Sequence, residues 1–384
     1  MVARPRPAGG HRVACVRVPT DQQQPVRPAY TGAGVAGLVP ALLGAAPSEW
    51  LPKCARDATT VVLLALDGLG WNAIEERRSA LSQLGALEGG PVPTVVPSTT
   101  ATALTSLTTG LAPGLHGVIG FRVRIDGSVL NMLSWQSGAR HAPDTMSVQR
   151  HTPFLGREIP VVTKAEFRNT AFTDVHLRGT RFHGWHAVSS LVEHCRRLAV
   201  AGEPLVYGYY PGVDTVAHAH GLHDGFYDLE IQAVDRLVGE LLDALPSSSA
   251  LVVTSDHGQV HVGPEGWLPL RPVIDLVDVC SGDGRFRYLH AVKGGGAELL
   301  AASRTEFGEH AWVLGRDELI DDGWLGPDVA STTRRRLGDV VLAAKGTVAF
   351  VDPDLEREAR LVSAHGSLSA DEMLVPVLAG RGRA

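Results

Sequence analysis

Three continuous apolar runs dominate the pattern of hydrophobic and polar positions along the chain. Their sequences are TTVVLLALDG (residues 59–68), LVYGYY (205–210) and ALVVTSDHG (250–258). Unbroken runs rich in β-branched and aliphatic residues indicate strands that are buried on both faces, as in parallel sheets. Residues 71–87 and 226–245 follow the first two runs with the apolar spacing of helices. Because strands and helices alternate, the pattern predicts an α/β fold with a mostly parallel central sheet.

A different pattern begins near residue 270. Residues 271–337 combine short strand, helix and strand signals with many Gly and Asp residues, which predicts a small α/β cap inserted into a larger domain. Residues 30–270 and 338–384 would then form the catalytic core on either side of the insertion. Residues 1–29 contain several Arg and Pro residues but no apolar run of signal-peptide length, so we expect a flexible N-terminal tail.

The composition narrows the class of partner. The 384 residues, 44% of them hydrophobic and 20% charged, are typical of a soluble globular protein. The formal net charge of −6 gives no attraction for a nucleic-acid duplex or an anionic membrane surface, and neither is expected as a partner. No segment approaches the ~20 apolar residues of a transmembrane helix. The four cysteines are far apart, which is typical of reduced thiols and predicts a cytoplasmic protein. The oligomeric state, monomer or homodimer, is left open.

A dense cluster of hydroxyl residues lies in residues 95–121, which contain PSTTATALTSLTTG followed by LAPGLHGVIGF. Residues 101–109 can form a short helix that Gly110 ends in a left-handed conformation. The free backbone N–H groups of the first turn and the helix dipole favour an anionic group there. A threonine on this turn is therefore a candidate nucleophile, provided that metal ions lower the pKa of its hydroxyl. A helix cap with a polar face is the ordinary alternative for such a cluster.

Acidic residues and histidines follow the predicted strands at positions that could hold these ions. The strands lead into LDG, PGVD and SDH, and the carboxyl ends of parallel strands form the edge where open α/β sheets bind ligands. Asp214 and His218 are spaced i, i+4, so one helical turn would point both side chains at one ion. Mixed carboxylate and imidazole ligands favour zinc, manganese or iron. Each motif is common alone, and only their conjunction predicts a two-metal site. The six candidate ligands are Asp67, Asp214, His218, Asp256, His257 and His365.

The order of five motifs resembles that of the alkaline phosphatase superfamily, in the branch of the nucleotide pyrophosphatase/phosphodiesterases and phosphonoacetate hydrolases. The motifs are LDGLG, PSTTATALTSLTTGLAPGLHG, DTVAH, SDHG and AHG, within residues 60–265 and 338–380. The resemblance implies the alkaline-phosphatase-like three-layer sandwich. It also implies that the nucleophile is Thr100, ten residues before Gly110 of the Thr-Gly pair, with Thr99 as the alternative if the register shifts.

The resemblance also divides the ligands between two divalent ions, zinc or manganese with iron as the remaining option. Thr100 would attack phosphorus, and water would then hydrolyse the phospho-threonine. One ion is assigned to Asp67, Thr100, Asp256 and His257, and the other to Asp214, His218 and His365.

A narrower resemblance concerns the substrate. The hydroxyl-rich stretch together with HGSLSADEMLVPVL (residues 365–378) is similar to an actinobacterial subgroup of cyclic di-AMP phosphodiesterases. It implies a small nucleotide as the partner and the hydrolysis of cyclic di-AMP to linear pApA and AMP. The alternatives are a nucleotide pyrophosphatase, a phosphomonoesterase or a phosphonoacetate hydrolase with the same site. A non-catalytic nucleotide sensor that keeps the fold is the alternative from another class.

One position departs from the family pattern. Nucleotide pyrophosphatases carry an Asn just after the HG turn that helps to hold a phosphate oxygen, and the equivalent position here is Phe121. The backbone N–H groups of Thr100 and Ala101, or the side chain of Asn131, could hold that oxygen instead. Further candidates are Phe121, Trp135, Phe172 and Tyr210 as walls of a base pocket, and Arg285 and Arg287 for a second phosphate. Core packing for the aromatic residues, and surface charge for the arginines, are the ordinary alternatives.

Overall fold

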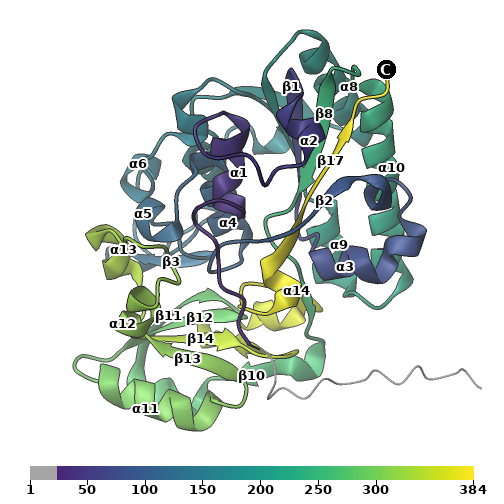
Figure 1. Cartoon of the computed structure of the whole chain (residues 1–384). Helices are drawn as coiled ribbons and strands as arrows, with labels where there is room; N and C mark the ends of the chain where they lie inside the picture. Colours follow the sequence, from purple (N-terminus) through teal and green to yellow (C-terminus); the bar gives the residue numbers. More distant parts are fainter. Residues whose placement is uncertain (1–23) are drawn as a thin grey trace, which may run out of the picture.

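A seven-stranded sheet forms the centre of the larger of two lobes in the computed structural model, which describes residues 24–384 (Figure 1). The strand order is β2-β17-β8-β1-β7-β5-β6. In its middle, β1 (Thr60–Leu66) pairs in parallel with β7 (Leu205–Tyr210) and β8 (Ser249–Thr254). These are the three apolar runs of the sequence, and the prediction of a mostly parallel central sheet is confirmed. The remaining strands are β5 (Pro160–Lys164) and β6 (Arg181–Trp185), which are parallel, and β17 (Leu374–Arg381) and β2 (Glu88–Pro93), which are antiparallel.

Helices cover both faces of this sheet. Every residue of β1 is buried, and its alternate side chains point to opposite faces. Leu63 belongs to a hydrophobic cluster with Leu104, whereas Leu64 belongs to a second cluster with Val234. The result is a three-layer sandwich. The first layer of helices is α1 (Val35–Leu42), α2 (Lys53–Arg56), α4 (Thr100–Thr109) and α7 (Ala171–Leu177), and the second is α3 (Trp71–Arg77), α8 (Val188–Val200), α9 (Gly212–His220) and α10 (Gly225–Ala244).

The smaller lobe, here called the cap, contains an antiparallel sheet in the order β11-β12-β14-β13. Its strands are β11 (Val277–Asp283), β12 (Phe286–Ala291), β13 (Ala311–Gly315) and β14 (Val340–Ala344), and α11 (Gly296–Phe307) packs on them. The expected end of the cap at residue 337 is therefore wrong, because β14 lies inside the cap sheet. β14 is an unbroken apolar run like the core strands, so its sequence does not reveal which sheet it joins. Beyond it, β15 (Ala349–Val351) pairs with β10 (Trp267–Pro269).

The predicted N-terminal tail, residues 1–29, lies mostly outside the described residues, which begin at residue 24. The described part is packed against the protein. The backbone N–H of Val26 donates to the carbonyl of Leu368 (2.8 Å). The guanidinium of Arg27 lies 3.8 Å from the centre of the Trp324 ring and donates to the carbonyl of Asp322 (2.9 Å). A flexible tail is therefore wrong for residues 24–29, which fasten the chain to both lobes.

The helix expected over residues 71–87 is shorter than its apolar spacing predicts. It ends as α3 at Arg77, and two 3-10 turns follow at Arg78–Ala80 and Leu84–Ala86. Asp235 of α10 explains the break, because its carboxylate accepts the backbone N–H groups of Gln83 (3.0 Å) and Leu84 (2.8 Å). Those groups would otherwise bond inside a continuing helix.

The remaining short elements lie around this framework. The helices are α5 (Pro113–His116), α6 (Thr145–Val148), α12 (Arg316–Asp321), α13 (Ser331–Arg336) and α14 (Ala370–Met373), and the strands are β3 (Arg122–Ile125), β4 (Ser128–Asn131), β9 (Val260–His261) and β16 (Ser363–Ala364). Further 3-10 turns are Pro153–Gly156, Ala165–Phe167, Pro264–Gly266, Arg271–Leu276 and Pro353–Arg360.

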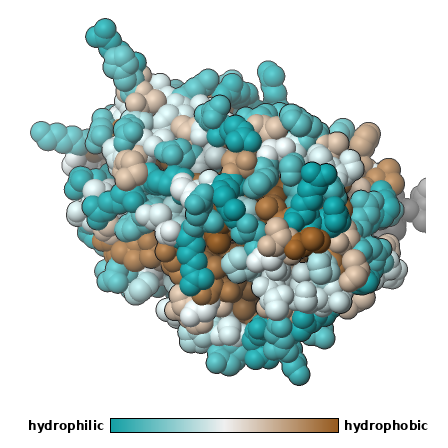
Figure 2. All heavy atoms as spheres, turned by 90° about the horizontal axis from the view of Figure 1, so that it is seen from above, coloured by the Kyte–Doolittle hydropathy of each residue, from teal (hydrophilic) through white to brown (hydrophobic). Residues whose placement is uncertain are grey.

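Within residues 24–384, none of the helices has the length and apolar character needed to span a bilayer. The face seen in Figure 2 is mostly hydrophilic, with separate brown patches between polar side chains rather than one broad hydrophobic area. Dispersed apolar side chains of this kind are normal on globular proteins and mark no particular site.

Candidate active site

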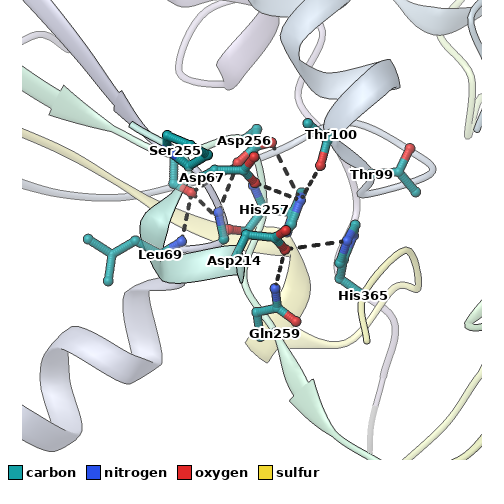
Figure 3. A network of polar contacts seen from close by, with 12 residues as sticks. Asp67, Leu69, Thr99, Thr100, Asp214, Ser255, Asp256, His257, Gln259 and His365 are labelled. Atoms are coloured by element: carbon teal, nitrogen blue, oxygen red, sulfur yellow. Dashed lines mark hydrogen bonds and ion pairs between the residues drawn. The ribbon is translucent and has the colours of Figure 1, made fainter. Parts of the chain in front are cut away.

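Acidic residues from three neighbouring strands meet at the carboxyl edge of the parallel sheet (Figure 3). Asp67 directly follows β1, Asp214 lies on the first turn of α9 behind β7, and Asp256 follows β8. The backbone N–H of Asp214 donates to the carbonyl of Asp67 (3.0 Å), which holds two of these loops together. His365 reaches the same place from the loop between β16 and α14, because the backbone of Gly366 pairs with that of Ser98 in front of α4.

A first cluster consists of Asp67, Asp256 and His257, whose ligand atoms lie within 4.8 Å of one another. Oδ1 of Asp256 accepts the N–H groups of Gly68 and His257 (both 3.1 Å), but its Oδ2 has no hydrogen-bond partner. Oδ2 of Asp67 accepts the hydroxyl of Tyr209, and its Oδ1 also has no partner. Both unpartnered oxygens are buried and lie 3.4 Å from Nε2 of His257.

A second cluster consists of Asp214, His218 and His365. Oδ1 of Asp214 lies 3.2 Å from Nε2 of His218 and 3.7 Å from Nε2 of His365, and it also accepts the side-chain amide of Gln259. The rings of His257 and His365 are stacked, with their centres 3.5 Å apart. The two clusters are therefore neighbours, because a histidine of the first stacks on a histidine of the second.

All three histidines are oriented by a backbone carbonyl that faces Nδ1. A carbonyl oxygen only accepts hydrogen bonds, so each Nδ1 carries the proton, and Nε2 of the neutral ring keeps a lone pair. These lone pairs point at carboxylate oxygens, which also carry lone pairs, and a cation between them would satisfy both. Outer hydrogen bonds of this kind fix metal-binding histidines in many proteins. The pairs are His218 with Ser363 (2.8 Å), His257 with Gly258 (3.0 Å) and His365 with Ser98 (3.0 Å).

Burial and charge shift the pKa values of Asp67 in the first cluster and Asp214 in the second in opposite directions. Burial, followed by the negative charges of Asp256 and Asp214, raises the pKa of Asp67 well above its usual range. Burial alone would also raise the pKa of Asp214, but His218 and His365 beside it lower that pKa below the usual range. Burial lowers the pKa of His218, but Asp214 outweighs it and raises the pKa to about 9, so near neutral pH Nε2 of this ring carries a proton that a bound cation would replace. The two buried carboxylates of the first cluster, each with an unpartnered oxygen, fit a divalent cation, and the one carboxylate and two imidazoles of the second cluster are a ligand set that fits another.

Thr100 is the hydroxyl residue that the structure brings to these clusters. It is the first residue of α4, and its Oγ1 lies 3.0 Å from Nε2 of His257. Thr99 is the N-cap residue, and its hydroxyl donates to Oγ1 of Thr102 (3.0 Å) instead. The helix ends at Gly110 with φ 72°, as its sequence predicts. The first turn of α4, whose N–H groups and dipole favour an anionic group, therefore begins at Thr100.

Two cavities flank Thr100, and both are lined by Thr100, Leu133 and Asp214. The core cavity, of about 270 Å³, has aromatic and apolar walls that include Phe167, Phe172 and Tyr209. The cap cavity, of about 280 Å³, lies against the cap. Its walls include Phe121, Trp267, Asp283 and Glu358. Thr100 therefore lies on the wall of both cavities.

Several residues proposed for substrate contacts lie elsewhere. Phe121 lines the cap cavity and Phe172 the core cavity, but Asn131 lines neither, because its side chain caps the backbone N–H groups of residues 133 and 134. Trp135 is also outside both cavities, and its indole N–H donates to the carbonyl of Pro143 (2.9 Å). Tyr210 stacks on Trp185 on the other face of the sheet.

The two arginines proposed for a second phosphate are buried in ion pairs between the cap and the C-terminal segment. Arg285 binds Glu372 through two hydrogen bonds (2.7 and 2.8 Å). Arg287 donates to Glu358 (2.5 Å). Both interpretations from the sequence, phosphate contact and surface charge, are therefore wrong for these side chains. Their partner acids follow by 87 and 71 residues, and no local sequence pattern marks the pairing.

Three site residues were not predicted. The sequence analysis names Tyr210 as a substrate contact, but it is Tyr209 that faces the site. Adjacent strand residues point to opposite faces, so only one of the two tyrosines can do so. Gln259 lies three residues after Asp256 in the SDHGQ stretch, and this closeness to two candidate ligands could have identified it as a site residue. Asp283 enters the cap cavity from the end of β11, and nothing in its local sequence distinguishes it from an ordinary Asp-Gly turn.

The geometry agrees with comparisons to known proteins. A family model described as type I phosphodiesterase / nucleotide pyrophosphatase matches residues 61–368. The chain belongs to this family. Members of the type I phosphodiesterase / nucleotide pyrophosphatase family hydrolyse phosphoester bonds and depend on divalent metals, which places the chain among hydrolases of this class. None of the curated proteins matches the chain by sequence.

Solved structures support the fold assignment. Murine ectonucleotide pyrophosphatase / phosphodiesterase 5 superposes with a TM-score of 0.64 at 16% identity, over 83% of this chain and 87% of that one. An inactive variant of the murine protein, in complex with AMP, gives a TM-score of 0.63 at 16% identity over the same shares. Phosphonoacetate hydrolase from Sinorhizobium meliloti 1021, in complex with phosphonoformate, gives 0.61 at 17% identity, over 85% and 91%. At these identities the likeness establishes the alkaline-phosphatase-like fold alone.

Proposed function

We propose that this family member is a divalent-metal-dependent phosphodiesterase that cleaves a nucleotide phosphodiester through a phospho-threonine on Thr100. The observation that carries the proposal is the position of the Thr100 hydroxyl, at a helix N-terminus and 3.0 Å from a ligand nitrogen of the first cluster. Asp67, Asp256 and His257, with Thr100, would hold one ion, and the second cluster would hold the other. When bound, two divalent cations would stabilise negative charge on the threonine oxygen and on the phosphoryl group.

The residues of the chain then have distinct roles. The Thr100 hydroxyl gives up its proton and its Oγ1 forms a bond to phosphorus, while the bond from phosphorus to the leaving oxygen breaks and the leaving alkoxide takes up a proton. The N–H groups at the start of α4 donate to a phosphoryl oxygen, a contact that fits the absence of the family's Asn at Phe121. Water then forms a bond to phosphorus while the bond from phosphorus to Thr100 Oγ1 breaks; Oγ1 takes up a proton from the water, and the product leaves as a phosphomonoester. Tyr209 and Gln259 hold Asp67 and Asp214 in place from behind.

The two cavities favour a diester over a monoester. A phosphomonoester or a small phosphonate such as phosphonoacetate has one organic substituent and would leave one cavity beside Thr100 without a ligand. A nucleotide diester has two. The aromatic core cavity suits a nucleobase, because stacking on aromatic side chains and apolar contact are the usual modes of base binding. The AMP complex of the murine neighbour is consistent with a nucleotide substrate for this fold.

Cyclic di-AMP is the specific substrate that the sequence resemblance adds, with pApA and AMP as the products. Both substituents of each phosphorus in cyclic di-AMP are nucleosides, which agrees with two cavities of similar size. A nucleotide pyrophosphatase with the same residues is the alternative substrate class. A nucleotide sensor without turnover would bind nucleotides but form no phospho-threonine.

The deciding experiment incubates the purified protein, with Mn²⁺ or Zn²⁺, with a panel of phosphate compounds and resolves the products by mass spectrometry. The panel contains cyclic di-AMP, pApA, ADP, a bis-nitrophenyl diester, nitrophenyl phosphate and phosphonoacetate. We expect hydrolysis of diesters ahead of monoesters and phosphonates, and a phosphorylated peptide containing Thr100 after acid quenching. Faster turnover of nitrophenyl phosphate than of every diester would contradict the proposal. Tight nucleotide binding without turnover in the presence of metal would instead support the sensor.

A further inference from the structure

The walls of both cavities contain no Lys or Arg among the described residues. Phosphate groups in proteins are commonly held by these side chains. The cap cavity instead presents two carboxylates, Asp283 of the cap and Glu358 of the C-terminal segment. Beyond the second cluster, which lines one side of this cavity, a second phosphate placed there would meet these two carboxylates and no Lys or Arg.

The two carboxylates differ in their surroundings. Glu358 is neutralised from behind by Arg287. Asp283 lies at the end of β11, its Oδ2 accepts the backbone N–H of Phe121 (3.1 Å), and it forms no ion pair within residues 24–384. Burial, which the Phe121 N–H only partly offsets, raises the pKa of Asp283 to about 7. Above that pH Asp283 is ionised and, unlike Glu358, has no ion-pair partner among the described residues, so it is the carboxylate of this cavity that is available to a ligand.

Asp283 also lines the same cavity as Thr100 and lies near the start of α4. A Cβ atom built on Gly366 would lie 3.3 Å from Cγ2 of Thr99 and 3.5 Å from Cβ of Asp283, so only a glycine separates the start of α4 from this carboxylate. The wall is held in place as well. Arg285, two residues further along, is fully buried with Glu372 of the core. A ligand group in the cap cavity would therefore meet Asp283 in a fixed position.

The two cavities differ in their walls, and this difference indicates which substituent of phosphorus each would hold. The core cavity has aromatic and apolar walls and suits the nucleoside that stays on phosphorus. The other substituent on phosphorus, the leaving group, then occupies the cap cavity. This assignment rests on the proposed function.

We propose that Asp283 determines leaving-group specificity, by accepting hydrogen bonds from an uncharged or cationic leaving alcohol and by repelling a leaving group that is itself a phosphate. The chain would then act on phosphodiesters whose leaving oxygen is bound to carbon and would discriminate against nucleoside diphosphates and other anhydrides. Cyclic di-AMP meets this condition, because its leaving oxygen belongs to a ribose and its second phosphate is one sugar away. Repulsion of a wrong ligand by like charge is a common source of specificity.

The test uses three compounds that share the nucleoside and differ in the leaving group. They are the 2-aminoethyl ester of AMP, the ethyl ester of AMP, and ADP. The measured quantity is the ratio of kcat/KM for the aminoethyl ester to kcat/KM for ADP. The intrinsic reactivity of the leaving groups cancels when this ratio is compared between the wild type and Asp283→Asn. Asn keeps an acceptor for the Phe121 N–H and removes only the charge.

We expect the ratio to fall about tenfold or more in Asp283→Asn, because a factor of this size corresponds to the loss of one modest interaction between charges. The ethyl ester should change less than the aminoethyl ester, because its leaving group carries no charge. Asp278→Asn is the matched control on the same strand, because Asp278 is exposed and pairs only with Arg124 (3.5 Å). That variant should keep the wild-type ratio. If Asp283→Asn does not fold, Asp283→Ser removes the same charge and is measured in the same way.

Failure of this inference is distinct from failure of the proposed function. If the wild type hydrolyses the AMP esters but the ratio in Asp283→Asn stays within about twofold of the wild type, the role of Asp283 is wrong and the phosphodiesterase proposal stands. If the wild type hydrolyses none of the three compounds and none of the panel, both proposals fall together.

Discussion

The hydroxyl oxygen of Thr100 lies 3.0 Å from Nε2 of His257, although 157 residues separate the two side chains. The contact depends on where α4 begins. Thr99 precedes the helix in an extended conformation and turns its hydroxyl toward Thr102, whereas Thr100, one residue later, faces the first cluster. The start of this helix therefore selects which of two adjacent threonines can react.

Replacing Thr100 by Ala should lower kcat by roughly a thousandfold or more, because the nucleophile is lost while the carboxylates and histidines remain. The metal content, measured by elemental mass spectrometry, should stay close to that of the wild type. Thr99→Ala is the matched variant one residue away, and we expect a far smaller loss of kcat from it. If Thr99→Ala is the inactive variant and Thr100→Ala retains turnover with metals bound, the nucleophile is Thr99.

Asp256→Asn tests the first cluster. An amide keeps the acceptor for the N–H groups of Gly68 and His257 but replaces the unpartnered Oδ2 by an NH₂ group, which cannot bind a cation. The variant should therefore fold and lose both metal and activity. The measurement is the number of ions per chain after dialysis against buffer without metal.

Asp235→Asn is the control for removing a buried carboxylate. Asp235 accepts backbone N–H groups of residues 83 and 84 and lies in neither cluster. We expect this variant to lose stability but to keep the wild-type metal content. Equal metal content in both variants and the wild type would mean that the first cluster is not a metal site.

The amount that could be predicted from the sequence differs between the strand ends and the cap. Asp67 and Asp256 follow apolar runs that read as parallel strands, and parallel strands end at a common edge, so their proximity follows from local pattern alone. The apolar run of β14 has the same pattern but joins the cap sheet, because strand pairing is decided by packing across the chain. Likewise Arg285 carries no local mark of burial, since its partner Glu372 comes 87 residues later.

Arg285→Ala should destabilise the protein by about 3–5 kcal/mol, because it leaves Glu372 as an unpaired charge in the interior. Arg304 on the same lobe forms an exposed pair with Glu318, and Arg304→Ala should cost less than about 1 kcal/mol. Urea unfolding of the two variants beside the wild type measures both quantities. Similar losses from the two substitutions would show that the buried pair does not stabilise the contact between the cap and the C-terminal segment.

His116 should make the protein less stable at mildly acidic pH. Its Nδ1 accepts the N–H of Val118 (3.1 Å), so the neutral ring carries its proton on Nε2, which donates to Ser106 (2.8 Å). Burial, with His151 and Arg336 nearby, lowers the pKa of His116 from 6.5 to about 3. Between these two pKa values the unfolded chain binds a proton that the folded protein does not. The contribution of neutral His116 to the free energy of unfolding is therefore fully present above pH 6.5 and is lost as the pH falls. From pH 7 to pH 5 this loss amounts to about 2 kcal/mol.

His116→Asn keeps an acceptor for Val118 and cannot titrate, so its free energy of unfolding should fall by about 2 kcal/mol less than that of the wild type over the same interval. Urea unfolding at the two pH values measures the difference, and parallel losses in both proteins would assign the acid sensitivity to other groups.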